Sequence, residues 1–336
     1  MTSPAISIVM PVKNAAQTLE ETLESIEAQT FREFELIIID DFSEDETLQL
    51  VKRWATRDGR FRWSPAESPG LVPSLNQALS EARAPLIARM DGDDLMLPTR
   101  LEKQRALFES DDTLGVVSCG VESFGENGIG EGFRLYDDWL NGLVSHQAMF
   151  DARFIESPLA HPSAMVRRSI LLEIDGYREM GWPEDYDLWL RLFAKGVRFQ
   201  KVPEVLLRWR DQPHRTSRVH HAYHPKAFQD CKISHLISGP LQSRRQIGIW
   251  GAGHWGGRLG RALMNEGYEV KFFVDIDPKK IGGTRHGMPI IASEGLTPDE
   301  ETPLLISVGR RGARGLIEAF LHERDFVSGR DYFALA

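Results

Sequence analysis

Apolar and polar positions alternate along the amino-terminal part of the chain in a pattern that predicts strands and helices in turn. Apolar runs at 6–10 and 34–39 are rich in β-branched residues and read as buried strands, the first ending at Pro11. Residues 18–29 and about 44–54 place their apolar side chains at helical spacing. A strand–helix–strand–helix succession predicts an α/β fold whose parallel strands are joined by right-handed crossovers.

Polar residues follow each predicted strand. They occur at 11–14, at 40–41 and, after a third apolar run at 85–88, at 91–94. Ligands of parallel sheets bind at the carboxyl ends of the strands, so these three segments are expected at one edge. The acidic segment 91–94 is either a solvated turn or, because oxygen ligands suit hard cations, a site for Mg²⁺ or Mn²⁺.

The middle of the chain is less regular. Residues 122–136 contain four glycines and little apolar periodicity, which predicts a long loop. Residues 161–166 read as a strand, in which His161 is either part of a binding site or a packed, hydrogen-bonded histidine. Trp182 either stacks on a ligand ring or packs in the core.

A second parallel unit follows a break at 238–240. A strand at 246–250 leads into a glycine turn and a helix, and a further strand at 270–274 ends at Asp275. Glycines at this spacing let a pyrophosphate approach a helix amino terminus, and the acid lies where a ribose hydroxyl would bind. The residues of this second nucleotide site are Gly251, Gly253, Gly256 and Asp275.

Only about 91 residues follow Gln246, which suffices for one mononucleotide-binding half. His254 and Trp255 within the turn would hinder a pyrophosphate. Two alternatives therefore stay open for this module: it binds NAD(P) or another nucleotide, or it has a structural or dimerising role. The predicted organisation is a catalytic domain at 1–218, a helical linker at 219–245 and a small Rossmann-like α/β domain at 246–336.

Composition narrows the function classes. A formal charge of -9 argues against a nucleic-acid partner, which needs a cationic face. Two cysteines are too few for a disulfide framework, which indicates a reducing cytoplasm. With neither a signal-peptide pattern nor an apolar run of membrane-spanning length, we expect a cytoplasmic protein that visits a membrane-borne substrate peripherally.

Four ordered motifs, at 8–14, 39–45, 74–76 and 88–94, resemble the nucleotide-binding half of family 2 inverting glycosyltransferases with the GT-A fold. Residues 184–189 are similar to that family's acceptor-side catalytic motif, and the resemblance covers about the first 215 residues. It implies a mixed, mainly parallel sheet flanked by helices. It also implies a nucleotide-sugar donor, a glycan or lipid-linked acceptor, and Mn²⁺ or Mg²⁺ as cofactor.

The resemblance assigns roles to single residues. Asp41 would accept hydrogen bonds from the base, Asp91 would contact the ribose, and Arg89 would neutralise phosphate. Metal ligands would be Asp93 and His214, although histidine is a less usual ligand for hard cations. The full set of donor-binding residues is Pro11, Val12, Asn14, Asp41, Asn76, Arg89, Asp91 and Arg215.

Structural alternatives stay open for several of these residues. Asp41 also fits a strand-end turn that caps the next helix, and Asn76 fits a packing role inside a helix. Asp94 is left undecided, since capping the following helix is a sufficient role.

Asp185 is the catalytic candidate. Inversion at an anomeric carbon needs a base that takes the acceptor's proton while its oxygen attacks opposite the leaving diphosphate. An acid in the first turn after Pro183 also stabilises a helix through the macrodipole, and both roles are compatible.

The sequence thus predicts an inverting glycosyltransferase that acts in bacterial surface glycan synthesis. The alternatives are an NAD-dependent sugar-nucleotide oxidoreductase and a non-catalytic nucleotide-sugar binding protein.

Overall fold

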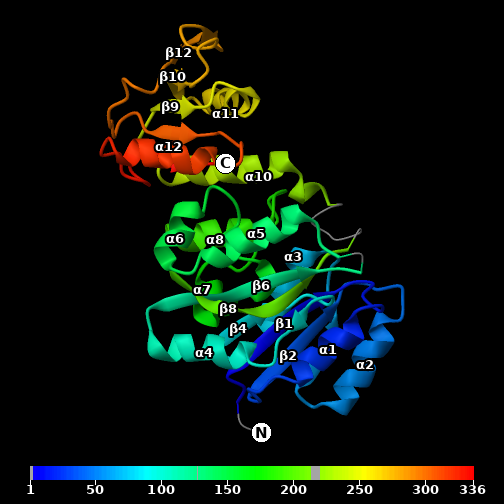
Figure 1. Ribbon diagram of the computed structural model, residues 1–336. Coiled ribbons are helices and arrows are strands. Elements are labelled where there is room, and N and C mark those ends of the chain that lie inside the picture. The colour runs from blue at the N-terminus through cyan, green and yellow to red at the C-terminus, as the bar shows by residue number, and fades with distance from the viewer. Residues whose placement is uncertain (1–2, 127, 213–219) are drawn as a thin grey trace. The chain divides into compact units, whose positions relative to one another are not determined.

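The computed structural model describes residues 3–126, 128–212 and 220–336, which form two compact units (Figure 1). Unit 1 comprises Met1–Met149 and Pro158–Ala227. Unit 2 comprises Phe150–Ser157 and Phe228–Ala336.

Unit 1 is built on an eight-stranded sheet in the order β3-β2-β1-β4-β7-β6-β8-β5. The pairs β1–β2, β2–β3, β1–β4 and β6–β8 are parallel, and β7 and β5 pair antiparallel with their neighbours. The predicted mixed, mainly parallel sheet is therefore present. Its strands are β1 (Ile6–Val12), β2 (Phe34–Asp40), β3 (Phe61–Pro65), β4 (Leu86–Arg89), β5 (Leu95–Met96), β6 (Leu114–Phe124), β7 (Met165–Arg167) and β8 (Arg198–Arg210).

The central strands β1 and β2 are buried along their whole length, which explains their nearly continuous apolar sequences. Strand β1 continues through Pro11 to Val12, so the prediction that it ends at Pro11 was wrong. Pairing with β4 ends at Val9. Residue alternation turns Pro11 toward that unpaired side, where its missing N–H costs no ladder hydrogen bond.

Helices pack beside this sheet (Figure 1). The chain passes between the units within α6 (His146–Ala152), beyond Ser157, and within α10 (Pro225–Ser238). The other unit 1 helices are α1 (Leu19–Glu27), α2 (Thr47–Arg57), α3 (Leu71–Glu81), α4 (Arg100–Ser110), α5 (Glu131–Gly142), α7 (Arg168–Glu173) and α8 (Glu184–Ala194), with short 3-10 turns η1 (His161–Ser163) and η2 (His221–Tyr223).

Two local predictions were wrong. The long loop expected at 122–136 is confined to the residues between Phe124 and Glu131, because β6 and α5 occupy its two ends. The strand expected at 161–166 begins with the 3-10 turn η1, and only β7 after it is extended.

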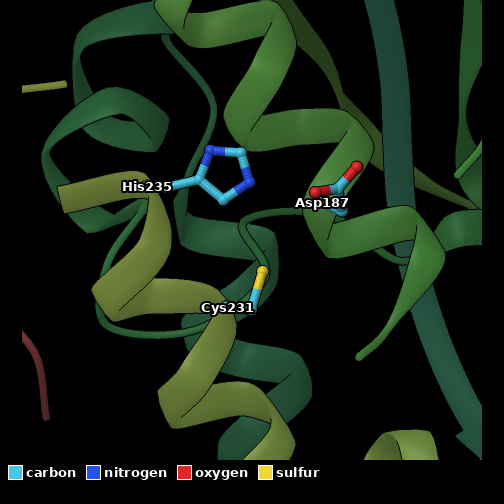
Figure 2. A group of neighbouring side chains, drawn as sticks. All are labelled: Asp187, Cys231 and His235. Carbon is cyan, nitrogen blue, oxygen red and sulfur yellow. The ribbon is translucent and has the colours of Figure 1, made fainter. Parts of the chain in front are cut away.

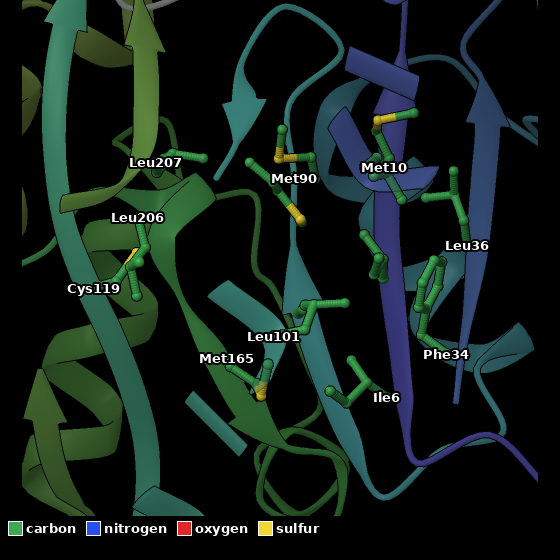
Figure 3. Close-up of a cluster of buried hydrophobic side chains, with 14 of the residues drawn as sticks. Ile6, Met10, Phe34, Leu36, Met90, Leu101, Cys119, Met165, Leu206 and Leu207 are labelled. Atoms are coloured by element: carbon green, nitrogen blue, oxygen red, sulfur yellow. The ribbon is translucent and has the colours of Figure 1, made fainter. Parts of the chain in front are cut away.

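The core of unit 1 gathers side chains from β1, β2, β4, β6 and β8 with helices α1, α2 and α4. Figure 3 shows Met10, Leu36 and Phe34 within it, beside Leu101 of α4. All four are at most 3% exposed, so the loops at the carboxyl ends of these strands are attached to a rigid, close-packed core.

Unit 2 contains a six-stranded sheet in the order β11-β12-β10-β9-β13-β14, in which every pair except β11–β12 is parallel. It has a separate core that includes Trp250, Ile306 and Leu321. Its elements after α10 are β9 (Gln246–Trp250), α11 (His254–Asn265), β10 (Glu269–Val274), β11 (Thr284–Arg285), β12 (Met288–Ile291), β13 (Leu304–Ile306), α12 (Ala313–His322) and β14 (Tyr332–Ala334).

The segment 150–157 belongs to unit 2 although the chain returns to unit 1 afterwards. Lys232 of α10 donates to the carbonyl oxygens of Ile155, at 2.6 Å, and Leu335, at 3.2 Å. One buried ammonium thus joins three distant segments. The domain boundaries predicted from the sequence, at residues 218 and 245, remain predictions, because the two units are divided at other residues.

Candidate active site

The loops after β1 and β2 are hydrogen-bonded to each other. Asn14 adopts a left-handed backbone conformation with φ of 50°. Its N–H donates to Ser43 Oγ at 3.0 Å, and its side-chain oxygen accepts from the Glu44 N–H at 2.8 Å. The Ala15 N–H donates to Thr47 Oγ1 at 2.7 Å. These contacts explain Asn14 structurally and hold the two loops as one surface.

Asp41 lies directly beyond β2 and is buried. Its Oδ1 accepts from the N–H of Gly70, the residue that precedes α3, at 2.9 Å. Lys13 Nζ lies 3.6 Å from its Oδ2. The next helix, α2, begins only at Thr47, so Asp41 braces the start of α3 and does not cap α2.

Arg89 ends β4 with a side chain that is 3% exposed. Its Nη2 donates to Asp91 Oδ1 at 2.6 Å, and its Nη1 donates to the Met90 carbonyl. The guanidinium is therefore held beneath the acidic loop, where it fixes one oxygen of Asp91.

Asp93 and Asp94 face β8. Asp94 Oδ1 accepts from the N–H of Arg210 at 2.7 Å. Arg210 Nε donates to the Asp93 carbonyl at 2.6 Å, and Gln212 Nε2 lies 3.3 Å from Asp93 Oδ2. Since α4 begins at Arg100, the helix-capping role suggested for Asp94 was wrong. Asp94 instead joins the acidic loop to the end of β8.

Gly92 allows the acidic loop to lie against the end of β1. A Cβ at this position would come within 2.9 Å of Val12 Cγ1. Thr18 Oγ1 donates to the Gly92 carbonyl at 3.0 Å. The close approach requires glycine between the two carboxylates and places Val12 beside them.

A divalent cation fits this donor set. One carboxylate oxygen from each of Asp91, Asp93 and Asp94 lies within 4.8 Å of the others. Oxygen-only ligands match Mg²⁺ and Mn²⁺, and a cation would offset the repulsion among the three acids.

Asp185 occupies the first turn of α8, where it is half-buried. Its Oδ1 accepts from the N–H of Tyr186 at 2.8 Å. The preceding residue, Glu184, is 5% exposed and points into the protein.

The pKa of the Tyr177 phenol depends on charges from both α8 and the acidic loop. Burial raises the pKa of Tyr177, Arg89 opposes that shift, and the charges of Glu184, Asp185 and Asp91 add to it. The negative charges of Asp91 and Asp185 thus both contribute to the raised pKa of Tyr177, although the two acids come from distant elements.

Asn76 on α3 uses its whole amide to hold the chain at Tyr177. Its Nδ2 donates to the Tyr177 carbonyl, and its Oδ1 accepts from the Tyr177 N–H, both at 2.9 Å. A Cβ on the neighbouring Gly176 would lie 2.5 Å from Asn76 Oδ1. This geometry favours the packing role over donor contact.

The predicted ligand His214 and phosphate clamp Arg215 lie outside the described residues. Sequence reasoning missed Arg210 and Gln212 as neighbours of Asp93, and Tyr223 as a partner of Glu184. Arg210 lies in a segment, 206–210, that resembles the end of the family's catalytic region, but the contacts of all three residues depend on segments that approach only in the folded chain.

The glycine turn of unit 2 is largely explained by its own packing. Cβ atoms would lie 2.9 Å from the Ser307 carbonyl oxygen at Gly251 and 1.8 Å from the Gly251 oxygen at Gly256. At Gly253 no atom of the described residues comes within 4 Å of such a Cβ. Gly253 alone among the three therefore leaves room for a ligand.

Asp275 is engaged within unit 2. Its Oδ2 accepts from the Ala252 N–H at 3.2 Å and from Lys280 Nζ at 2.8 Å, while its Oδ1 accepts from the Asp277 N–H at 3.0 Å. This arrangement favours bracing of the glycine turn over recognition of a ribose.

Figure 2 shows Cys231 and His235 on successive turns of α10, and Asp187 on α8. Within unit 1, Asp187 accepts from Arg191 Nε at 2.7 Å and from Trp182 Nε1 at 3.1 Å. Trp182 is half-buried and held by this hydrogen bond before α8, so it is not a fully buried core residue, and stacking on a sugar ring stays a prediction.

A mixed sheet that gathers acidic loops at the carboxyl ends of its parallel strands, beside an acid on a helix, defines the class as a glycosyltransferase of the GT-A type. The chain belongs to glycosyltransferase family 2: residues 7–175 match the family model described as glycosyl transferase family 2. The predicted family and fold class are thereby confirmed for unit 1.

Two relatives illustrate the family. EpsE of Bacillus subtilis, named as a glycosyltransferase, is 36% identical over 213 residues, which cover 62% of this chain and 73% of that protein. The O-antigen biosynthesis glycosyltransferase WbnJ of Escherichia coli is 31% identical over 224 residues, 65% of this chain and 84% of its own.

Solved structures share the fold. The S. aureus TarS structure in complex with UDP-GlcNAc aligns with a TM-score of 0.54 at 18% identity, over 70% of this chain and 67% of that one. The mannosyltransferase PcManGT from Pyrobaculum calidifontis, in complex with GDP-Man and Mn²⁺, gives 0.50 at 21% identity, over 72% and 65%. The chain thus spans about two thirds of each.

Among the helices of the described residues, none combines the length and apolar character that a bilayer span requires.

Proposed function

We propose that this glycosyltransferase catalyses an inverting, metal-dependent transfer of a sugar from a nucleoside-diphosphate donor to a hydroxyl acceptor. The observation that carries the proposal is the cluster of carboxylate oxygens from Asp91, Asp93 and Asp94, which lie within 4.8 Å of one another in a chain of this family. The loops after β1 and β2, with Asp41, would receive the nucleotide.

Asp185 is the proposed base. As the acceptor oxygen forms its bond to the anomeric carbon, the bond from that carbon to the diphosphate oxygen breaks. The diphosphate leaves with the electron pair, and the acceptor's proton passes to the Asp185 carboxylate. Its position in the first turn of α8 favours the ionised form that this step needs.

Asp93 is the proposed principal metal ligand, with Asp91 and Asp94 beside it. When bound, the cation would supply Lewis acidity that offsets charge on the departing diphosphate. The Mn²⁺ named with PcManGT supports this assignment. His214 and Arg215 remain predictions for the same locality.

The proposed acceptor is a glycan or a lipid-linked glycan in bacterial surface polysaccharide synthesis, within the cytoplasm. The name of WbnJ refers to O-antigen biosynthesis, and that of AmsE of Erwinia amylovora, 29% identical over 199 residues, to amylovoran biosynthesis. UDP and GDP donors both occur among the structural neighbours, so the base of the donor stays open.

For unit 2 we propose a Rossmann-like module whose glycine turn, open at Gly253, receives a nucleotide or serves assembly of a homodimer. The engaged carboxylate of Asp275 weighs against NAD(P), and the named relatives give the oxidoreductase alternative no support.

The decisive experiment replaces Asp185 with Asn. We expect turnover of UDP- and GDP-sugars to fall at least about a thousandfold, because the isosteric amide cannot take the proton, while Mn²⁺-dependent donor binding measured by calorimetry is retained. Asp112→Asn, at a side chain that is 99% exposed, is the matched control. Unchanged turnover in Asp185→Asn would refute the base assignment.

A further inference from the structure

A buried chain of hydrogen bonds ends at Glu184, the residue before the proposed base. The Tyr177 hydroxyl lies 2.9 Å from His161 Nε2, and His161 Nδ1 lies 3.5 Å from Glu184 Oε1. The Tyr223 hydroxyl donates to Glu184 Oε2 at 2.6 Å. We call these four residues the Glu184 network.

The protonation states of Glu184 and His161 determine which group donates and which accepts in each of these hydrogen bonds. Burial raises the pKa of Glu184, but hydrogen bonds from His161 and Tyr223 lower it by more, so the group is a carboxylate that only accepts. Burial and the charge of Arg89 lower the pKa of His161 despite Glu184 and Asp91, which keeps the imidazole neutral. Nδ1–H therefore donates to Glu184, and Nε2 accepts from Tyr177.

Packing alone does not require this arrangement. A carboxylate that is 5% exposed loses its hydration, and an apolar residue of similar size would avoid that penalty. Besides each other, Glu184 and His161 need two hydroxyl groups from separate segments, those of Tyr223 and Tyr177. Such an expensive arrangement next to a proposed base indicates a role in the reaction.

The network connects the helix that carries Asp185 to the helix beside the donor loops. Asn76 of α3 holds the Tyr177 backbone by two hydrogen bonds of 2.9 Å, and Asp41 braces the start of the same helix at Gly70. Consecutive residues of a helix point about 100° apart, so a fixed Glu184 side chain determines where Asp185 points.

We propose that Glu184, held by His161 and Tyr223, is a positioning residue that sets the direction of Asp185 relative to the donor. The inference rests on the proposed function of Asp185 as base. Small displacements of a reacting group cost large factors in rate, whereas donor affinity depends on the loops at the other end of the network.

The test measures kcat and donor KM for Tyr223→Phe, His161→Leu and His161→Asn, using release of nucleoside diphosphate from UDP- and GDP-sugars with Mn²⁺. We expect kcat to fall about 10- to 100-fold in Tyr223→Phe and His161→Leu while donor KM changes less than about twofold. His161→Asn should recover much of the loss, because its amide can donate near the position of Nδ1.

Two matched controls remove comparable buried groups elsewhere. Tyr268→Phe deletes a buried hydroxyl that donates to the Leu241 carbonyl, and Glu35→Gln neutralises a buried carboxylate at the opposite end of β2. Both should keep kcat within about twofold of the unsubstituted chain. Hydrogen exchange at the Tyr186 amide, which donates to Asp185, should accelerate in Tyr223→Phe and stay unchanged in the controls.

Unchanged kcat in folded Tyr223→Phe and His161→Leu, or an equal rise of donor KM in both, would overturn the inference. Asp185→Asn is measured in parallel to separate the two proposals. If that variant is inactive while the network variants are not, only the positioning role fails. If it turns over donor normally, the base assignment fails.

Discussion

Individual carboxylates at the acidic loop differ in what holds them. Asp91 is paired with the buried Arg89, and Asp94 accepts a backbone N–H from Arg210. Asp93 Oδ2 accepts from Gln212 Nε2 at 3.3 Å, a longer hydrogen bond than those of 2.6 Å at Asp91 and 2.7 Å at Asp94. Asp93 is the proposed principal ligand of a cation, and its carboxylate oxygens suit Mg²⁺ and Mn²⁺.

Replacing Asp93 with Ala tests this assignment. We expect donor affinity in the presence of Mn²⁺ to fall at least about tenfold, because the cation loses its principal ligand. Calorimetric titration of UDP- and GDP-sugars with and without Mn²⁺ measures the effect, and Asp112→Ala is the exposed control. Equal affinity of the unsubstituted chain in both conditions would contradict the metal site.

Glu35 gives a prediction for acid stability. Burial raises its pKa, but hydrogen bonds from Arg83 and Ser7 lower it from 4.5 to about 2. The folded pKa lies below the unfolded value, so this stabilisation is complete above pH 4.5 and is lost as the pH falls toward 2.

Glu35→Gln should therefore lower the free energy of unfolding by at most about 3 kcal/mol at pH 7 and by little near pH 2. Urea unfolding of both proteins across this range is the measurement. A difference between them that stays constant from pH 7 to pH 3 would rule out the ionic origin.

Among the elements, strand β2 connects the core of unit 1 to the loop that carries Asp41. Its Leu36 is fully buried in the core of unit 1, while the same strand ends beside Asp41. A cavity at Leu36 should weaken the whole sheet edge, since close-packed cores relax only partly.

Leu36→Ala should destabilise unit 1 by about 2–5 kcal/mol. Leu316→Ala, at a side chain that is 76% exposed, should change stability by less than about 0.5 kcal/mol. Denaturant unfolding followed by circular dichroism compares the two variants. Similar losses in both would show that burial in this core does not control stability.

The boundaries of β1 and β2 were predicted to within two residues, whereas the end of β6 was predicted poorly because its partner β8 lies far along the chain. The runs at 6–10 and 34–39 are buried on both faces, so local sequence suffices. Strand β6 extends to Phe124 because that residue pairs with Arg210 of β8. The glycines after Phe124 led to the prediction of a long loop at 122–136, because pairing between segments so far apart in the sequence leaves no local pattern.

At the scale of the whole molecule, two cores predict two unfolding transitions. Donor with Mn²⁺ at about 100 times its dissociation constant should stabilise the transition of unit 1 by about 2.7 kcal/mol. A ligand of the glycine turn should shift only the other transition, and Leu36→Ala identifies which transition belongs to unit 1. Thermal scans with UDP- and GDP-sugars and with NAD(P) are the measurement, and a single concerted transition would contradict the expectation.

Sequence by itself determined the succession of strands and helices, the acidic groups at the strand ends and the family. Strands that are buried on both faces have nearly continuous apolar sequences, and parallel topology brings the carboxyl ends of the strands to one edge of the sheet. Only the tertiary structure decided how neighbouring acids differ. Asp94 is engaged by Arg210, and Glu184 by Tyr223, because hydrogen bonding depends on distances between segments that sequence spacing does not encode.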